Sequence, residues 1–283
     1  MDQKAYWERE ALARRRSPDH PVIAAYVLPK IDIVRRHVEL TQPTRLLDVG
    51  CGNGFFTFYF DRICDAYGVD YSERMLQLNP SKKTFLMEAH DLDFEDNSFD
   101  VVFCHSLLHH VECVDRVIHE MRRVSRRYVV ILEPNRNNPL MFLMSLCVKA
   151  ERGGLKFSLG YLRRAAVRSG LRIVASFSYG TVVPIETPTC MLPIVQRLAR
   201  LSSFKHAAGM TNIIIAEKDG WYPVAAENAA VPRGRWHSGV QFPKEGKAAF
   251  PTTQLRARDT AEKPRFGDGS WSSQQYVLIA SRG

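Results

Sequence analysis

The stretch that decides the fold is "TRLLDVGCGNGFF", Thr44–Phe56. Its first part is a short apolar run closed by glycine, which is the pattern of a buried β-strand. Gly50, Gly52 and Gly54 follow this run, and Asp48 lies inside it. Glycine lets the chain turn tightly and brings bare backbone against a ligand. The stretch therefore predicts a strand, then a ligand-binding turn, then a helix.

The spacing of the glycines narrows the class of ligand. A dinucleotide fingerprint, G-x-G-x-x-G, would place its third glycine at the position of Phe55. The pattern G-x-G-x-G instead favours a ligand with a carboxylate at the loop and a nucleoside further along. Asp70 ends the next apolar run, where a carboxylate can accept two hydrogen bonds from a ribose diol. The alternative role for Asp70 is an N-cap of the following helix.

Short apolar runs alternate with helical patterns along the first two-thirds of the chain. We expect strands at 44–50, 64–70, 83–90, 98–106 and 126–135, and helices at 55–63, 72–80 and 113–125. This alternation predicts a doubly wound, mostly parallel sheet with helices on both faces. A helical insert at 137–170 and two further strands, at 171–180 and 211–218, complete seven strands, the last of them antiparallel.

The composition divides the chain into three parts. We expect residues 1–39 to form an N-terminal helical lid, 40–218 the ligand-binding domain, and 219–283 a largely disordered tail. The tail is rich in Gly, Pro, Ala and charge, and it shows no sustained hydrophobic period.

Bulk composition indicates a soluble globular protein. The 283 residues are 45% hydrophobic, and the six cysteines include no C-x-x-C pair, so we expect a reduced, cytoplasmic chain. The longest apolar run, Pro139–Val148, is too short to span a bilayer. It either packs in the core or, with Arg136, Lys149 and Arg152 beside it, makes peripheral contact with an anionic membrane. The net charge of +9 shows no aromatic–basic alternation, so nucleic acid is not the expected partner.

Four motifs together resemble class I S-adenosylmethionine-dependent methyltransferases, of the small-molecule type that includes quinone and sterol methylases (methyltransferase type 11). They are "LLDVGCGNG", "GVDYS", "FEDNSFDVVFCHSLLHHV" and "VILEPN". The resemblance covers about residues 40–218 and implies an α/β, Rossmann-like fold with S-adenosylmethionine as cofactor.

The resemblance also implies roles for individual residues. The methionine end of the cofactor would be held by Asp48, Gly50, Cys51, Gly52, Asn53 and Gly54. Asp70 would bind the ribose and Tyr71 would cover the adenine. Glu88, Ala89 and His90 would lie near the adenine, although Glu88 stands where the family usually has Asp. Cys104 and His105 would lie beside the sulfonium.

The reaction requires the protein to align a nucleophile with the cofactor's methyl group and to exclude water. A general base helps when the nucleophile starts protonated, and the candidates are His105, His109 and His110. The alternative is that these histidines pack structurally or orient loops. Glu133, after the fifth strand, either binds substrate or caps the next helix. No metal site is expected, because adjacent residues on a helix point about 100° apart.

Three functions are compatible with these features. The favoured one is methyl transfer to an oxygen or carbon nucleophile of a small-molecule, lipid-like or glycan-linked metabolite. The second is methylation of RNA or protein, which the positive net charge supports. Against it, the fourth strand ends in "CHSL" and lacks the motif of amino-group methylation. The third is a cofactor-binding protein without catalysis.

Overall fold

The computed structural model describes residues 15–181, 187–194 and 209–218. All of them belong to one compact unit, Met1–Gly234. The first 14 residues of the expected lid and the whole of the expected tail lie outside the described residues.

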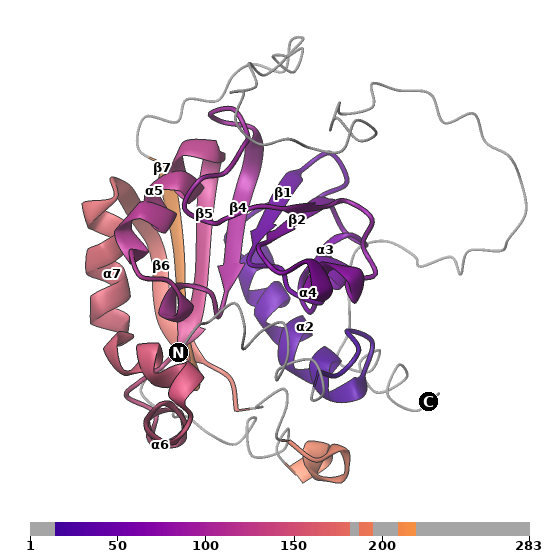
Figure 1. Ribbon diagram of the computed structural model, residues 1–283, viewed down its shortest axis with the longest axis vertical. Coiled ribbons are helices and arrows are strands. Elements are labelled where there is room, and N and C mark those ends of the chain that lie inside the picture. Colours follow the sequence, from indigo (N-terminus) through magenta and orange to yellow (C-terminus); the bar gives the residue numbers. More distant parts are fainter. Residues whose placement is uncertain (1–14, 182–186, 195–208, 219–283) are drawn as a thin grey trace, which may run out of the picture. The chain divides into compact units, whose positions relative to one another are not determined.

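The described strands form one seven-stranded sheet in the order β3-β2-β1-β4-β5-β7-β6 (Figure 1). The strands are β1 (Arg45–Val49), β2 (Asp65–Asp70), β3 (Thr84–Leu86), β4 (Phe99–His105), β5 (Ser125–Pro134), β6 (Leu171–Tyr179) and β7 (Thr211–Lys218). β1 to β5 pair in parallel, whereas β7 is antiparallel to both β5 and β6. The predicted α/β sheet, mostly parallel with an antiparallel last strand, is confirmed.

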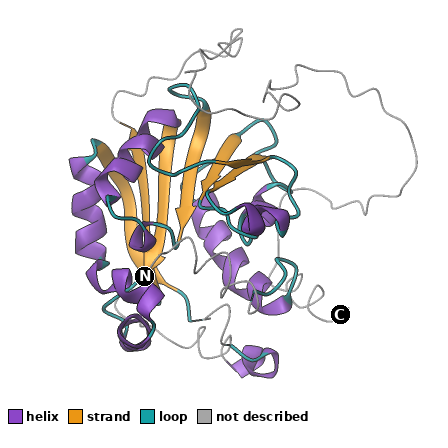
Figure 2. Cartoon of the chain, in the orientation of Figure 1, coloured by secondary structure: helices purple, strands orange, loops and turns teal. Residues whose placement is uncertain are grey.

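Helices connect and cover the strands (Figure 2). The α-helices are α2 (Pro21–Arg35), α3 (Thr57–Phe60), α4 (Glu73–Gln77), α5 (Val114–Val124), α6 (Pro139–Cys147) and α7 (Leu159–Arg168). Short 3-10 turns are η2 (Leu108–His110), η3 (Lys149–Lys156) and η4 (Thr189–Met191). The helix expected at 55–63 shrinks to the single turn of α3, because the glycine loop continues through Phe55 before the chain becomes helical.

Alternate residues along the central strands point to opposite faces of the sheet, as the period of two requires. On β4, Val101 and Phe103 pack into the apolar core beneath α2 and α3. Val102 and Cys104 pack into the other core, beneath α5 and α7. The sheet is therefore buried on both faces, which explains why its strands read as continuous apolar runs.

The strand order reverses between β1 and β4. The chain runs outward from β1 through β2 to β3, then returns to β4 on the other side of β1. In open parallel sheets, ligands bind beyond the carboxyl ends of the strands at such a switch point. No described helix is long and apolar enough to cross a membrane.

Candidate functional site

A cavity opens at this switch point, beyond the carboxyl ends of β1, β2, β4 and β5. Its walls also receive residues from α2, from α6 and η3 of the insert, and from the start of β7. Seven of the lining side chains carry the chemistry discussed below: Tyr26, Asp48, Asp70, His105, His109, His110 and Glu151.

The glycine loop forms the floor at the end of β1. Gly50, Gly52 and Gly54 all have positive φ angles, of 73°, 50° and 89°, which residues with a Cβ rarely adopt. Space is also restricted, because a Cβ on Gly54 would lie 2.5 Å from Oδ1 of Asn79. Asn79 braces the loop further by donating from Nδ2 to the carbonyl oxygen of Gly52 at 3.1 Å. The sequence does not mark Asn79 as a site residue, because its position before Pro80 indicates only the end of a helix.

Asp70 joins the loop to the end of β2. Its carboxylate accepts hydrogen bonds from the backbone N–H of Gly52 at 2.8 Å and of Ser72 at 2.9 Å. The helix N-cap is Ser72, which accepts from the backbone N–H of Met75, so Asp70 is not the cap. Burial raises the pKa of Asp70, while the two backbone donors oppose this rise. Asp70 and its neighbour Tyr71 both line the cavity.

Asp48 is the most deeply buried carboxylate of the floor, with 2% of its surface exposed. Its Oδ2 accepts from the hydroxyl of Thr57 at 2.6 Å. Burial, assisted by the negative charge of Asp70, raises the pKa of Asp48 to about 7. Two carboxylates therefore face one cavity beside bare glycine backbone, which suits a ligand with an ammonium group and a diol.

His105, at the end of β4, lies in a polar cluster of the cavity wall. Its Nε2 accepts a hydrogen bond from the hydroxyl of Tyr26 at 2.6 Å and lies 3.2 Å from Oγ of Ser106. Burial, with the nearby positive charge of Lys30, holds the pKa of His105 well below its usual value, so its ring is neutral. Burial also raises the pKa of the Tyr26 hydroxyl, which therefore donates. Tyr26 comes from α2, and no sequence motif marks it.

His109 bridges two carboxylates that come from distant parts of the chain. Its Nδ1 lies 2.6 Å from Oε2 of Glu133, at the end of β5, and its Nε2 lies 3.0 Å from Oε2 of Glu151, in η3. Burial opposes a charge here, but Glu133 and Glu151 raise the pKa of His109 to about 10. At neutral pH both ring nitrogens donate, so His109 in this arrangement has no lone pair with which to accept a proton.

Glu133 is completely buried and holds η2 in place. Its Oε1 accepts from the backbone N–H groups of Leu107 and Leu108 at 2.9 and 2.7 Å. Neither alternative drawn from the sequence, substrate binding or capping of the next helix, describes these contacts. The cap of α6 is Asn138, whose Oδ1 accepts from the first turn.

His110 stacks against His109, with their ring centroids 3.9 Å apart. Burial and the neighbouring His109 charge lower the pKa of His110 to about 3. His110 is therefore a neutral imidazole in the cavity wall and a weak base.

The remaining predicted cofactor residues divide into two groups. Cys51 and Asn53 line the cavity together with Gly50 and Gly52. The described lining residues do not include Cys104, whose side chain is fully buried in the core beneath α5. Nor do they include three residues of the loop after β3: Glu88, Ala89 and His90. Glu88 is exposed, and the adenine contacts implied for these three residues stay predictions.

The insert supplies an apolar rim to the cavity. Met141 and Met144 lie one turn apart on α6, and both line the cavity. On its other side α6 presents Leu143 and Leu146, which are 54% and 52% exposed. This helix therefore separates the cavity from an exposed apolar surface.

Comparison with known proteins agrees with this geometry. Residues 47–131 match the family model of a methyltransferase domain. The chain is 34% identical over 93 residues to a phosphatidylethanolamine N-methyltransferase of Cereibacter sphaeroides, a match that covers 29% of this chain and 46% of that protein. It is also 34% identical over 103 residues to a demethylmenaquinone methyltransferase of Staphylococcus aureus strain JH9, covering 32% of this chain and 42% of that protein. The matches thus span less than half the length of these curated relatives.

Solved structures share the fold. A crystal structure of an S-adenosylmethionine-dependent methyltransferase from Thermotoga maritima superimposes with a TM-score of 0.59 at 18% identity, over 76% of this chain and 99% of that one. The resemblance to class I methyltransferases and the Rossmann-like fold, both expected from the motifs, are confirmed.

Proposed function

We propose that this chain, which contains a class I methyltransferase domain, transfers a methyl group from S-adenosylmethionine to an oxygen or carbon nucleophile of a small-molecule, lipid-like or glycan-linked metabolite. The observation that carries the proposal is the cavity at the β1–β4 switch point. There, two buried carboxylates and the positive-φ glycine loop meet a wall of histidines.

The residues present fit the cofactor. Its ammonium and sulfonium are cationic, and Asp48 and Asp70 supply the opposite charge at the cavity floor. Gly50 and Gly52 leave the backbone bare where the methionine end would lie, and Tyr71 stands beside Asp70 to cover the adenine. When bound, the cofactor supplies an electrophilic methyl group on a good leaving group.

The cavity wall also carries the three histidines considered as general bases. His105 lines the cavity with a neutral ring, but its lowered pKa makes it a weak base, so we assign it to positioning the acceptor. Tyr26 fixes the ring by donating to its Nε2. Of the other two candidates, His109 is hydrogen-bonded to two carboxylates through both ring nitrogens. His110 is a weak base, because its pKa is lowered to about 3.

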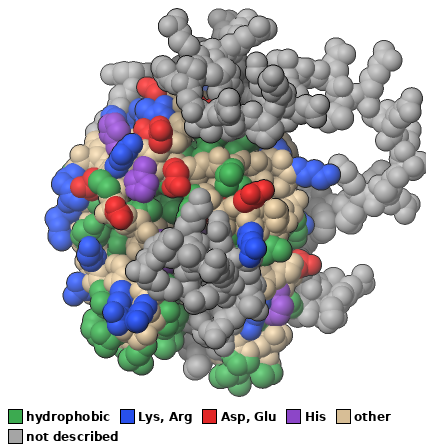
Figure 3. Space-filling model, viewed as in Figure 1, with side chains coloured by type: hydrophobic (Ala, Val, Ile, Leu, Met, Phe, Trp, Pro, Cys, Tyr) green, Lys and Arg blue, Asp and Glu red, His purple; other side chains and the backbone are tan. Residues whose placement is uncertain are grey.

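The insert supports a lipid-like acceptor presented at an anionic membrane surface. Hydrophobic side chains gather over α6 in Figure 3, with Lys and Arg beside them. Arg136, Lys149 and Arg152 are the exposed cations that flank α6 in the sequence. Because Met141 and Met144 on the same helix line the cavity, an acyl or prenyl chain could pass from the membrane into the site along one helix. The relatives named for phosphatidylethanolamine and demethylmenaquinone support acceptors of this kind.

The decisive experiment is calorimetric titration of the full chain with S-adenosylmethionine and with its demethylated product. We expect micromolar binding that Asp70→Asn weakens by at least about tenfold, since the change removes the charge and one acceptor of a bidentate contact. The matched control is Asp19→Asn, which alters an exposed aspartate that is not among the described lining residues.

Activity is tested with radiolabelled cofactor against quinols, phospholipids and glycan precursors in mixed micelles. Methyl transfer to a lipid-soluble product supports the proposal. Failure of the intact chain to bind cofactor contradicts it, and so does transfer only to RNA or protein. Binding without transfer to any acceptor would favour a non-catalytic cofactor-binding protein.

A further inference from the structure

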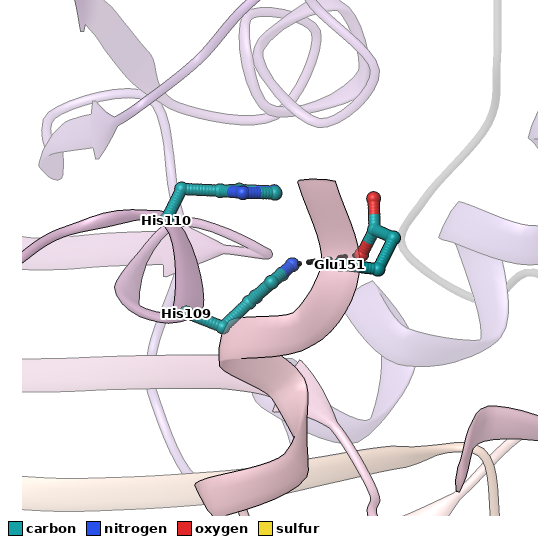
Figure 4. A group of neighbouring side chains, drawn as sticks. All are labelled: His109, His110 and Glu151. Atoms are coloured by element: carbon teal, nitrogen blue, oxygen red, sulfur yellow. Dashed lines mark hydrogen bonds and ion pairs between the residues drawn. The ribbon is translucent and has the colours of Figure 1, made fainter. Parts of the chain in front are cut away.

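Three potential metal ligands converge in the cavity wall. His109, His110 and Glu151 each place one ligand atom so that all three atoms lie within 4.8 Å of one another. Figure 4 shows the two imidazole rings and the carboxylate pointing toward a common space. All three side chains line the cavity.

The sequence led to the opposite expectation, because consecutive residues of an α-helix point about 100° apart. In the structure His109 and His110 lie in the short 3-10 turn η2, where their ring centroids are 3.9 Å apart. Glu151 then reaches the same point from η3, 42 positions after His109. The local sequence of neither segment predicts that Glu151 lies beside His109 and His110.

His109 has the outer partner that metal-binding histidines usually have. Its Nδ1 donates to Oε2 of Glu133 at 2.6 Å, and this leaves Nε2 directed at Glu151. A carboxylate on the far nitrogen fixes the tautomer and the ring orientation of a ligating histidine. Glu133 is itself immobilised by two backbone N–H donors, so the imidazole is held on a rigid base.

The two segments that carry the ligands are tightly packed together. A Cβ on Gly153, two residues after Glu151, would lie 1.7 Å from the carbonyl oxygen of His109. Only glycine allows η3 to approach η2 this closely, so the distance between Glu151 and the histidines is set by backbone contact.

We propose that His109, His110 and Glu151 bind one divalent transition-metal ion, of the Zn²⁺ or Fe²⁺ class. Two imidazoles and one carboxylate form the ligand set that such ions take in sites that keep positions open for other ligands. The carboxylates of Glu133 and Glu151 balance the two positive charges. The proton that now links Nε2 of His109 to Glu151 leaves to solvent when the ion binds.

An ion held by these three side chains would keep its remaining positions for ligands that enter the cavity, which all three line. Resting on the proposed function, we assign them to an oxygen of the methyl acceptor, which the ion would hold and make more acidic beside the bound cofactor. The acceptor class would then be a phenol, enol or hydroxyl compound rather than an amine.

The test is a titration of the untagged full chain with Co²⁺, followed by visible absorption, and with Zn²⁺, followed by calorimetry. We expect one ion per chain, with a spectrum of nitrogen and oxygen ligands and without thiolate charge-transfer bands. His110→Ala and Glu151→Gln should each lower the affinity by at least about 100-fold, because even outer partners of metal ligands contribute 10–100-fold. His119→Ala, which removes an exposed histidine of α5, is the control and should change nothing.

Several outcomes would overturn the proposal. The first is that the wild-type chain binds no stoichiometric metal ion. The second is that His110→Ala and Glu151→Gln both bind the ion as tightly as wild type does. The third is that His119→Ala loses metal binding. Circular dichroism identifies a variant that does not fold, and X-ray absorption of the Zn²⁺-loaded wild-type chain then decides the ligand set without any substitution. Cofactor affinity is measured separately on the same samples. Metal binding without cofactor binding would contradict the proposed function while leaving the metal site in place. Cofactor binding without metal binding would contradict the metal site while leaving the proposed function in place.

Discussion

Two buried carboxylates of the cavity floor experience different surroundings. Asp70 accepts two backbone N–H bonds, which stabilise its charge. Asp48 accepts from the hydroxyl of Thr57, a neutral donor, and lies near the charge of Asp70. Burial is the main reason that the pKa of Asp48 rises to about 7, and the negative charge of Asp70 adds to the rise. Asp48 therefore changes its charge near neutral pH.

This rise of the Asp48 pKa predicts a pH-dependent stability. In the unfolded chain Asp48 ionises near its ordinary pKa of 3.8, whereas in the folded chain it ionises near 7. Between these values the folded state retains a proton that the unfolded state has lost, so stability falls as pH rises. Asp48→Asn cannot ionise, and its side-chain oxygen can still accept from Thr57. The variant should gain stability relative to wild type from about pH 4 to about pH 8, by up to roughly 4 kcal/mol.

Urea unfolding of both proteins across this pH range, without cofactor, measures the difference. Asp19→Asn, at an exposed position, should follow the wild-type curve. Parallel curves for Asp48→Asn and wild type would mean that Asp48 is ionised in the folded chain well below neutral pH.

At the scale of the element, α6 has two apolar sides with different surroundings. Met141 and Met144 line the cavity, while Leu143 and Leu146 are exposed. Asn138 caps the helix and Pro139 begins it, so its start is fixed locally. A capped helix with an exposed apolar side and flanking cations is typical of a segment that lies in a membrane interface.

We expect Leu143→Glu/Leu146→Glu to lower binding to anionic vesicles by at least about tenfold, because two leucines no longer insert and two negative charges are added. Thermal unfolding should change little, since both side chains are exposed in the folded chain. Vesicle flotation measures binding. Val167→Glu, at a 58% exposed position on α7, controls for added charge elsewhere. Equal flotation of wild type and the double variant would exclude α6 as the membrane contact.

At the scale of the whole molecule, the sheet is complete within the described residues. β7 lies between β5 and β6 and ends at Lys218. The Lys218 side chain donates to Oδ1 of Asn97 and to the carbonyl oxygen of Ser125, which ties the end of the strand to the domain. The described part of the domain ends with this strand, and the boundary at residue 218 that the sequence suggests stays a prediction.

Deletion of residues 220–283 should leave the domain folded, with a melting temperature within about 3 °C of the full chain, equivalent to less than about 1 kcal/mol. Differential scanning calorimetry measures the change. A longer deletion that also removes Thr211–Lys218 should abolish cooperative unfolding, because it takes out the buried strand that joins β6 to the rest of the sheet. A much larger loss in the shorter deletion would show that the tail contributes to the fold.

The sequence by itself determined the features that depend on neighbouring residues. Apolar runs of strand length, capped helices and the G-x-G-x-G turn are local patterns, so the order of the elements and the parallel sheet could be predicted. Asp48, Asp70, Gly50 and Gly52 could be placed in the site for the same reason, whereas Gly54 is not among the described lining residues. Each lies at or just beyond a strand end, and parallel strands that meet at a switch point bring these ends together.

The tertiary structure decided which distant residues share the cavity. Tyr26 from α2 contacts His105, and Glu151 from the insert contacts His109, although neither pair is close in sequence. Cys104 and His105 are adjacent, yet only His105 is among the described lining residues. Local patterns carry no information on how an insert packs against a sheet, and it is this packing that turned a predicted base, His109, into a bridge between two carboxylates.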